Sequence, residues 1–243
     1  MIPVTHYSDR VHTIELDSPE GPLHAILARP DGAGPWPGVV VVHDALGITE
    51  DLRHQIDRLT AAGYLVLAPD LFSRGRARCL RELFRAVVFT GEGPGITEIL
   101  TARDHLAADA ACSGRIAVLG FCLGGGFALL TAPRGFDAAA PFYPSLWLDY
   151  REILTGACPI VASFGSRDPS LRGRGDKLAR TLTALDVPHD VRTYPGATHG
   201  FANVFPGDPV LQRIGLGHDA EATEDAWVRI FTFFDRHLGT PAS

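Results

Sequence analysis

The chain has no excess of basic residues and no apolar run long enough to cross a membrane. It carries 22 Lys and Arg against 28 Asp and Glu, a formal net charge of −6 over 243 residues. This balance argues against a broad basic surface for nucleic acid or anionic lipid. No apolar run approaches the roughly 18 residues of a membrane helix, and the opening MIPVTHYSDR lacks the pattern of a signal peptide. We therefore expect a cytoplasmic protein with a small-molecule partner, and no partnership with nucleic acid or a membrane.

Cysteine is also scarce, and its spacing excludes two kinds of site. The four cysteines are Cys79, Cys112, Cys122 and Cys158. They are far apart and form no CxxC pair, so neither a zinc site nor a disulfide framework is indicated. The ten histidines include no HExxH spacing either. We expect reduced thiols and no metal site.

What the sequence does have is a regular alternation of strand and helix patterns. With 46% hydrophobic residues the chain can bury a sizeable core, and it shows no repeat or linker, so we expect a single domain over residues 1–243. The pattern predicts a mostly parallel sheet with helices on both faces and no large cap domain. Predicted strands cover residues 11–16, 24–30, 38–44, 64–70, 115–120, 138–143, 159–165 and 190–196. Predicted helices cover residues 52–59, 78–89, 95–111, 175–185 and 222–238.

One cysteine lies where a predicted strand becomes a predicted helix. Cys122 is the centre of GFCLG, which has the G-x-nucleophile-x-G form of a nucleophile elbow. The flanking glycines suit a strained turn whose neighbouring residues pack too closely for side chains. A helix N-terminus at this point would favour a thiolate. The alternative is an ordinary buried thiol, since free cysteine packs as a small hydrophobe.

Two further residues follow strands in the order that a hydrolase triad requires. Asp168 comes after the predicted strand 159–165 in SRDPS, and His199 comes after the predicted strand 190–196 in GATHGF. In α/β hydrolases the nucleophile, the acid and the histidine follow each other along the chain in this order. Alone, Asp168 could be a turn residue before Pro169 and His199 a surface histidine. Together with Cys122, they predict a catalytic triad.

These segments resemble a known family. GFCLGGG, SRDPSLRG and YPGATHGF are similar to the signature segments of the dienelactone hydrolases, a branch of the α/β hydrolases with a cysteine nucleophile. The resemblance runs over nearly the whole chain and implies an α/β-hydrolase fold and hydrolysis of lactones or esters without cofactor or metal. It makes Cys122 the nucleophile, His199 the general base and acid, and Asp168 the residue that orients the imidazole.

The mechanism of such an enzyme assigns two backbone groups as well. An acyl-enzyme forms on the cysteine while backbone N–H groups hold the oxyanion. One donor is the N–H of the residue after the nucleophile, here Leu123. The second comes from the loop after the strand 38–44, and we expect the N–H of Ala45.

Two positions depart from the family pattern. The family has a glutamate that pairs with the resting thiol, and Asp44 stands at the matching position, one methylene shorter; a helix-capping role for Asp44 is the alternative. The family's arginine just after the catalytic histidine, which binds a substrate carboxylate, is matched by Asn203. A neutral amide cannot form a bidentate clamp on a carboxylate.

Other side chains could recognise the substrate. Within SRGRARCLRELFR we expect Arg81, or else Arg78, to replace the missing arginine, although a solvated helix face is the alternative. Aromatic residues near the predicted mouth favour a less polar ester or lactone, although most of them could equally belong to the core. They are Phe72, Phe121, Tyr143, Trp147, Phe201 and Phe205.

The sequence thus predicts an ester or lactone hydrolase of the dienelactone hydrolase type. The alternatives are a general short-chain carboxylesterase or thioesterase, and a binding protein without activity on the same fold. A monomer or a small homo-oligomer fits the sequence equally well.

Overall fold

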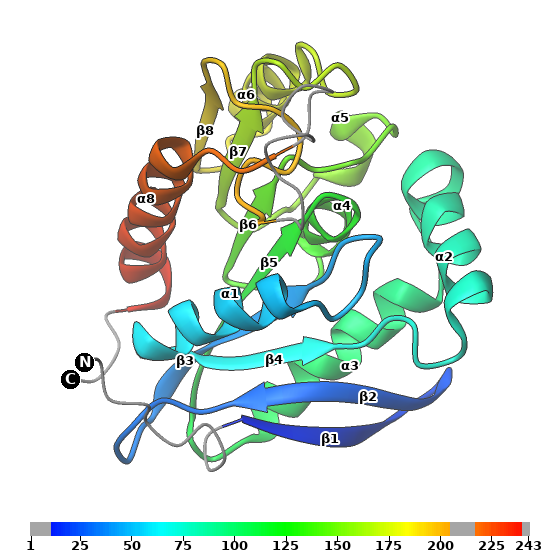
Figure 1. Ribbon diagram of the computed structural model, residues 1–243, viewed down its shortest axis with the longest axis vertical. Coiled ribbons are helices and arrows are strands. Elements are labelled where there is room, and N and C mark those ends of the chain that lie inside the picture. Colours follow the sequence, from blue (N-terminus) through cyan, green and yellow to red (C-terminus); the bar gives the residue numbers. More distant parts are fainter. Residues whose placement is uncertain (1–10, 205–216, 240–243) are drawn as a thin grey trace.

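All eight strands that the structure describes belong to one sheet. The computed structural model describes residues 11–204 and 217–239. The sheet order is β1-β2-β4-β3-β5-β6-β7-β8, so β3 and β4 stand in the sheet in the reverse of their order along the chain (Figure 1). The strands are β1 Val11–Ser18, β2 Gly21–Ala28, β3 Trp36–Val42, β4 Leu65–Pro69, β5 Cys112–Phe121, β6 Ala138–Phe142, β7 Ile160–Gly165 and β8 His189–Tyr194.

The first two pairings in the sheet order are antiparallel, and the rest are parallel. β1 pairs with β2, and β2 with β4, in antiparallel register. From β4 to β8 every pairing is parallel. Strand β3 is buried at every position, as its continuous valine run predicts for a strand covered on both faces. The predicted mostly parallel α/β fold is therefore confirmed.

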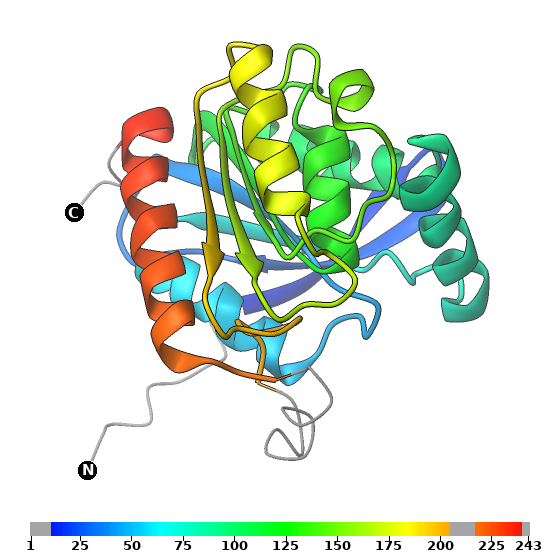
Figure 2. The same ribbon diagram turned by 90° about the horizontal axis from the view of Figure 1, so that it is seen from above.

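Helices cover both faces of the sheet. Viewed from above, α1 and α8 lie on one face, and α3, α4 and α6 lie on the other (Figure 2). The helix α2 and the π-helical turn η1 form the outermost part of the molecule on the side away from α8. The helical bounds are α1 Glu50–Ala61, α2 Arg76–Arg85, η1 Ala86–Thr90, α3 Pro94–Ala108, α4 Leu123–Thr131, α5 Tyr150–Ile153, α6 Arg174–Ala184 and α8 Ala220–Leu238. None of these helices is both long and apolar enough to span a bilayer.

The predicted helix 78–89 differs from the observed one. It begins earlier, at Arg76, directly after Gly75 with φ 103°. It changes to a π-helical turn at Ala86 and stops at Gly91, which has φ 67°. The short helix α5 lies between β6 and β7, a stretch for which the sequence predicts no helix. These corrections do not alter the layers, but they place α2 and η1 beside the loops that follow β3 and β6.

Candidate active site

Cys122 occupies a strained turn between β5 and α4. Its φ of 52° and ψ of −113° lie in a region that non-glycine residues rarely adopt. The glycines two residues away make this turn possible. A Cβ at Gly120 would lie 2.1 Å from the Gly124 carbonyl oxygen, and one at Gly124 would lie 2.2 Å from that of Val42. The turn therefore has the geometry predicted for a nucleophile elbow, with the thiol half-buried at its tip.

The next two glycines bring the loop after β6 against the same turn. A Cβ at Gly125 would lie 2.6 Å from the Phe142 carbonyl oxygen, and one at Gly126 would lie 2.4 Å from that of Ser145. Strands β5 and β6 are neighbours in the sheet, so both chains emerge at the same edge. The GGG run thus has a packing role: it lets three segments of backbone meet around the thiol.

Asp168 and His199 lie side by side at this edge. Asp168 follows β7, His199 follows β8, and the Oδ2 of Asp168 is 2.5 Å from the Nδ1 of His199. The other carboxylate oxygen of Asp168 accepts hydrogen bonds from the N–H and the hydroxyl of Ser170. Burial acts to raise the pKa of Asp168, but the hydrogen bonds from His199 and Ser170 lower it below its ordinary value. The carboxylate is therefore held in its charged form.

His199 is held between Asp168 and Cys122. Burial acts to lower the pKa of His199, but hydrogen bonds with Asp168 and Cys122 raise it to about 10. Because Nδ1 faces Asp168, Nε2 is the ring nitrogen left for the thiol. The ring also packs against Tyr143, with 5.1 Å between ring centroids. The structure brings together the three residues that the sequence singles out.

The two predicted oxyanion donors belong to α4, in the case of Leu123, and to the loop after β3, in the case of Ala45. Leu123 is the first residue of α4, so its N–H has no partner within the helix. The loop after β3 is fixed by Arg76, whose guanidinium donates to the carbonyl oxygens of Ala45 and Leu46, both at 3.0 Å. Arg76 also stacks on Phe72, 5.1 Å from the ring centroid. The sequence alone gives no signal that separates Arg76 from the other arginines of its segment.

Asp44 lies near the site, but its carboxylate is hydrogen-bonded within its own loop. Its Oδ1 accepts a hydrogen bond from the N–H of Leu46 at 2.7 Å. Burial raises the pKa of Asp44, although this N–H and the nearby His199 act to lower it. Within the described ranges, no hydrogen bond joins the Asp44 carboxylate to Cys122. The predicted control of the thiol by Asp44 therefore stays a prediction.

A match to a family model decides the relationship to known proteins. The model of the dienelactone hydrolase family matches residues 23–238. The chain belongs to the dienelactone hydrolase family. It is thus an ester hydrolase of the dienelactone hydrolase type, with the α/β-hydrolase fold that its resemblance predicts.

Individual proteins agree with this assignment. The carboxymethylenebutenolidase of Rhodococcus opacus is 29% identical over 82% of this chain and 81% of its own. The solved structure named m3DLH has a TM-score of 0.82 at 24% identity and covers 94% of this chain and 98% of that one. A dienelactone hydrolase-like promiscuous phosphotriesterase from metagenomic libraries has a TM-score of 0.75 at 21% identity, covering 94% and 99%. These two structural likenesses show the shared fold alone.

Asn203 stands at the position where the resemblance places the family's carboxylate-binding arginine. Both ends of its side-chain amide are hydrogen-bonded to other side chains of the protein. Its amide nitrogen donates to Asp51 at 2.6 Å, and its amide oxygen accepts from the hydroxyl of Tyr143. Asn203 is 4% exposed, and Tyr143 is fully buried. Burial raises the pKa of Tyr143 well above its ordinary value, so the phenol stays neutral and donates. In this member of the dienelactone hydrolase family, the position joins the loop after β8 to α1.

Three of the aromatic residues that we expect near the substrate, Phe121, Tyr143 and Phe201, lie inside the core. Phe121 is stacked on Phe142, with centroids 5.0 Å apart. Phe201 packs edge-on against Tyr143 at 5.3 Å. Both side chains are fully buried, so they support the ring of Tyr143 from behind, whereas Trp147 is 45% exposed. Phe205 lies outside the described residues.

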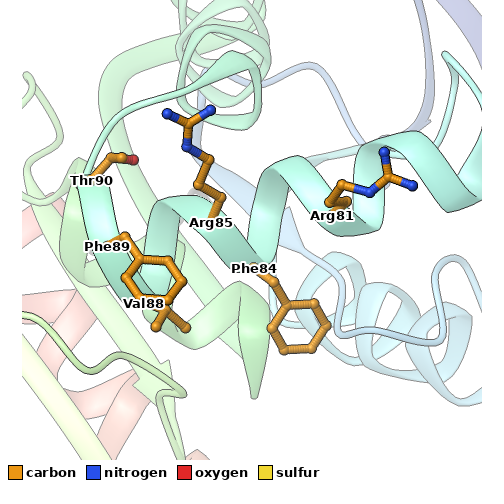
Figure 3. Close-up of a pocket in the computed structure, with 6 residues that line it drawn as sticks. All are labelled: Arg81, Phe84, Arg85, Val88, Phe89 and Thr90. Atoms are coloured by element: carbon orange, nitrogen blue, oxygen red, sulfur yellow. The ribbon is translucent and has the colours of Figure 1, made fainter.

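The two candidate arginines of α2 have different surroundings. Arg78 is 69% exposed and pairs with Glu82 at 2.9 Å. Arg81 has no ion pair among the described residues, and the same holds for Arg85. Both line an open pocket of about 560 Å³ with Phe84, Val88, Phe89 and Thr90. The two guanidinium groups point to one side of the helix and the two phenyl rings to the other (Figure 3).

A residue that the sequence does not single out contacts the thiol directly. The Oγ of Ser145 is 3.4 Å from the Sγ of Cys122. Ser145 follows β6 by three residues, and β6 is the neighbour of β5 in the sheet. A polar residue in the loop after β6 could therefore be expected near Cys122. For metals, no cluster of three or more His, Cys, Asp or Glu suited to an ion occurs in residues 11–204 and 217–239.

Proposed function

We propose that this chain hydrolyses an ester or lactone through an acyl-enzyme on Cys122. The observation that carries the proposal is the Asp168–His199 contact of 2.5 Å beside a thiol at the tip of a strained elbow. A nucleophile next to a base that a third group orients is the arrangement for covalent catalysis. The pKa of His199, raised to about 10 by its partners despite burial, favours a charged imidazolium beside Cys122.

The steps follow from these positions. The Cys122 proton passes to Nε2 of His199, and the thiolate attacks the carbonyl carbon of the substrate. The N–H groups of Leu123 and Ala45 hold the resulting oxyanion. His199 then returns its proton to the leaving oxygen as the C–O bond breaks, which leaves a thioester. In the second half, His199 removes a proton from water, the hydroxide attacks the thioester, and the thiolate leaves as the acid is released.

The substrate is proposed to be an ester or lactone with an apolar portion. The Rhodococcus relative is named a carboxymethylenebutenolidase, and that substrate class includes a carboxylate. Here Asn203 is committed to Asp51 and Tyr143, so a substrate carboxylate would need Arg81. Exposed apolar side chains, Leu46 and Trp147, follow β3 and β6 at the edge of the sheet that carries Cys122. These features support a wider range of neutral esters than a strict carboxylate-binding enzyme accepts.

The function is tested with p-nitrophenyl acetate before and after treatment with iodoacetamide. We expect turnover of the ester, loss of turnover on alkylation, and labelling of Cys122 before the other three cysteines by mass spectrometry. A folded protein without turnover on any activated ester would contradict the hydrolase proposal and favour a binding protein. Turnover that survives complete alkylation of Cys122 would contradict its role as the nucleophile.

A further inference from the structure

The hydroxyl of Ser145 is the nearest polar group to the candidate nucleophile that neither the family resemblance nor the mechanism uses. Its Oγ lies 3.4 Å from the Cys122 Sγ, within hydrogen-bond range for sulfur. Ser145 is 6% exposed, so water has little access to satisfy the hydroxyl instead. Among the described residues, this hydroxyl has no other hydrogen-bond partner. Either group can donate while Cys122 is a thiol, but a thiolate has no proton, so the hydroxyl is then the only possible donor of this contact.

The backbone fixes Ser145 in this position. Its N–H donates to the carbonyl oxygen of Cys122 at 2.9 Å. Its own carbonyl packs against Gly126, where a Cβ would come within 2.4 Å. Two residues later, the N–H of Trp147 donates to the carbonyl of Val87 at 3.0 Å, which anchors the loop to η1. A group held by such contacts is preorganised, so it needs no reordering when charge develops on the sulfur.

Asp44 does not occupy this place. Its carboxylate faces the N–H of Leu46, and a second negative charge beside a thiolate would disfavour the thiolate. A hydroxyl has the opposite effect, because it donates to the charged sulfur without adding charge. We propose that Ser145 is a further catalytic residue, whose hydroxyl donates a hydrogen bond to the Cys122 thiolate.

This role rests on the proposed function, because it requires Cys122 to be the nucleophile. When the Cys122 proton moves to His199, the sulfur becomes negative and its hydrogen bond with Ser145 strengthens. The bond weakens when the thioester forms, since a thioester sulfur is a poor acceptor. It strengthens again when the thiolate leaves in the second half of the reaction. Ser145 thus stabilises the sulfur in both states in which it carries charge.

The test measures alkylation of Cys122 by iodoacetamide as a function of pH, in the unmodified protein and in Ser145→Ala. Without the hydroxyl, the pH at which alkylation reaches half of its maximal rate should rise by about one unit, as expected for the loss of a hydrogen bond to a charged group. Below that pH, kcat for p-nitrophenyl acetate should fall on the order of tenfold. Thermal unfolding shows whether the variant is folded, and Ser145→Gly removes the same hydroxyl should alanine disturb the loop.

The control is Ser166→Ala, a serine on an exposed loop whose hydroxyl accepts from the N–H of Gly196. It should leave the alkylation profile unchanged. If Cys122 is alkylated first in every variant and the profile of folded Ser145→Ala or Ser145→Gly matches that of the unmodified protein, the role of Ser145 is refuted while the nucleophile stands. If Cys122 is not the preferred site of alkylation in the unmodified protein, the proposed function itself fails.

Discussion

Two regions of the molecule differ in how many of their polar groups already have partners. We call the edge of the sheet with Cys122, Asp168 and His199 the partnered side, and α2 with η1 the unpartnered side. At the carboxyl edge of β5, β7 and β8, the side chains of Cys122, Asp168 and His199 all contact one another or a fixed hydroxyl. On α2 and η1, by contrast, Arg81 and Arg85 have no ion pair among the described residues and face an open pocket. Groups that perform chemistry must be placed before the substrate arrives, whereas a charge that recognises substrate must stay available.

The most severe test of the partnered side is the replacement of the thiol. Cys122→Ala should lower kcat/KM for p-nitrophenyl acetate on the order of 10⁶-fold, because no acyl-enzyme can form. Cys158→Ala is the matched control, since burial raises the pKa of the Cys158 thiol to about 12 and keeps it unreactive. Steady-state kinetics on both variants measure whether the loss of activity is specific to Cys122. Equal losses in the two would show that Cys122 has no special part in the reaction.

A smaller loss is expected when the histidine loses its orienting partner. Asp168→Asn should lower kcat on the order of 10²- to 10⁴-fold, because the amide neither fixes the ring nor stabilises its charge. Stability should change as well. The folded-state pKa of His199 is raised from an ordinary 6.5 to about 10, so its contribution to stability is complete below about pH 6.5 and is lost as the pH rises through 10.

Denaturant unfolding at pH 6, 8 and 10 measures this contribution. The unmodified protein should lose part of its free energy of unfolding between pH 6 and 10. Asp168→Asn should show a weaker dependence over the same window, because the hydrogen bond that raises the pKa of His199 is gone. The same slope in both proteins would mean that the Asp168–His199 pair does not hold the imidazolium.

The glycine that brings the β6 loop to the thiol gives a third test. Gly126→Ala places a Cβ 2.4 Å from the Ser145 carbonyl oxygen, so the loop must shift, at a cost of about 1–3 kcal/mol in stability. Activity should fall on the order of tenfold as Ser145 moves. Gly114→Ala is the control: its φ of 80° adds strain, but the new Cβ meets nothing within 4 Å. If both variants lose stability and keep full activity, the packing of Gly126 does not position the site.

The partnered side is also the side that the sequence predicts well. Each of Cys122, Asp168 and His199 follows its own strand, and parallel strands bring such residues to one edge. The elbow glycines are visible in the sequence because no other residue fits there. Ser145 carries no such signature, since a serine in a loop has no pattern until the neighbouring strand is known. The orientation of Asp44 is likewise set by a local bond to the Leu46 N–H, which the sequence leaves open.

The sequence does not predict which arginine of α2 is free to bind a substrate, because that depends on which side chains already have partners and on which of them line a pocket. The pair between Arg78 and Glu82 is local, because the two residues are four apart on one helix, whereas nothing in the sequence shows that Arg81 lines a pocket. Asn203 has a structural role instead of a substrate-binding one. Its amide oxygen accepts a hydrogen bond from Tyr143, and its amide nitrogen donates one to Asp51. Which polar groups are already occupied depends on contacts between distant segments, and those follow from the fold as a whole.

The smallest expected effect concerns the unpartnered side. If Arg81 binds a substrate carboxylate, Arg81→Ala should raise KM for an ester that carries a carboxylate by less than about tenfold, since exposed ion pairs contribute little, and should leave neutral esters unaffected. Arg78→Ala is the matched control on the same helix, and its charge is already paired with Glu82. The measurement is the ratio of kcat/KM for a carboxylate-bearing and a neutral ester in all three proteins. An unchanged ratio in Arg81→Ala would exclude Arg81 as the replacement for the family's missing arginine. A fall in the ratio for Arg81→Ala alone would show that an unpaired charge on α2 takes over recognition that the loop after β8 no longer provides.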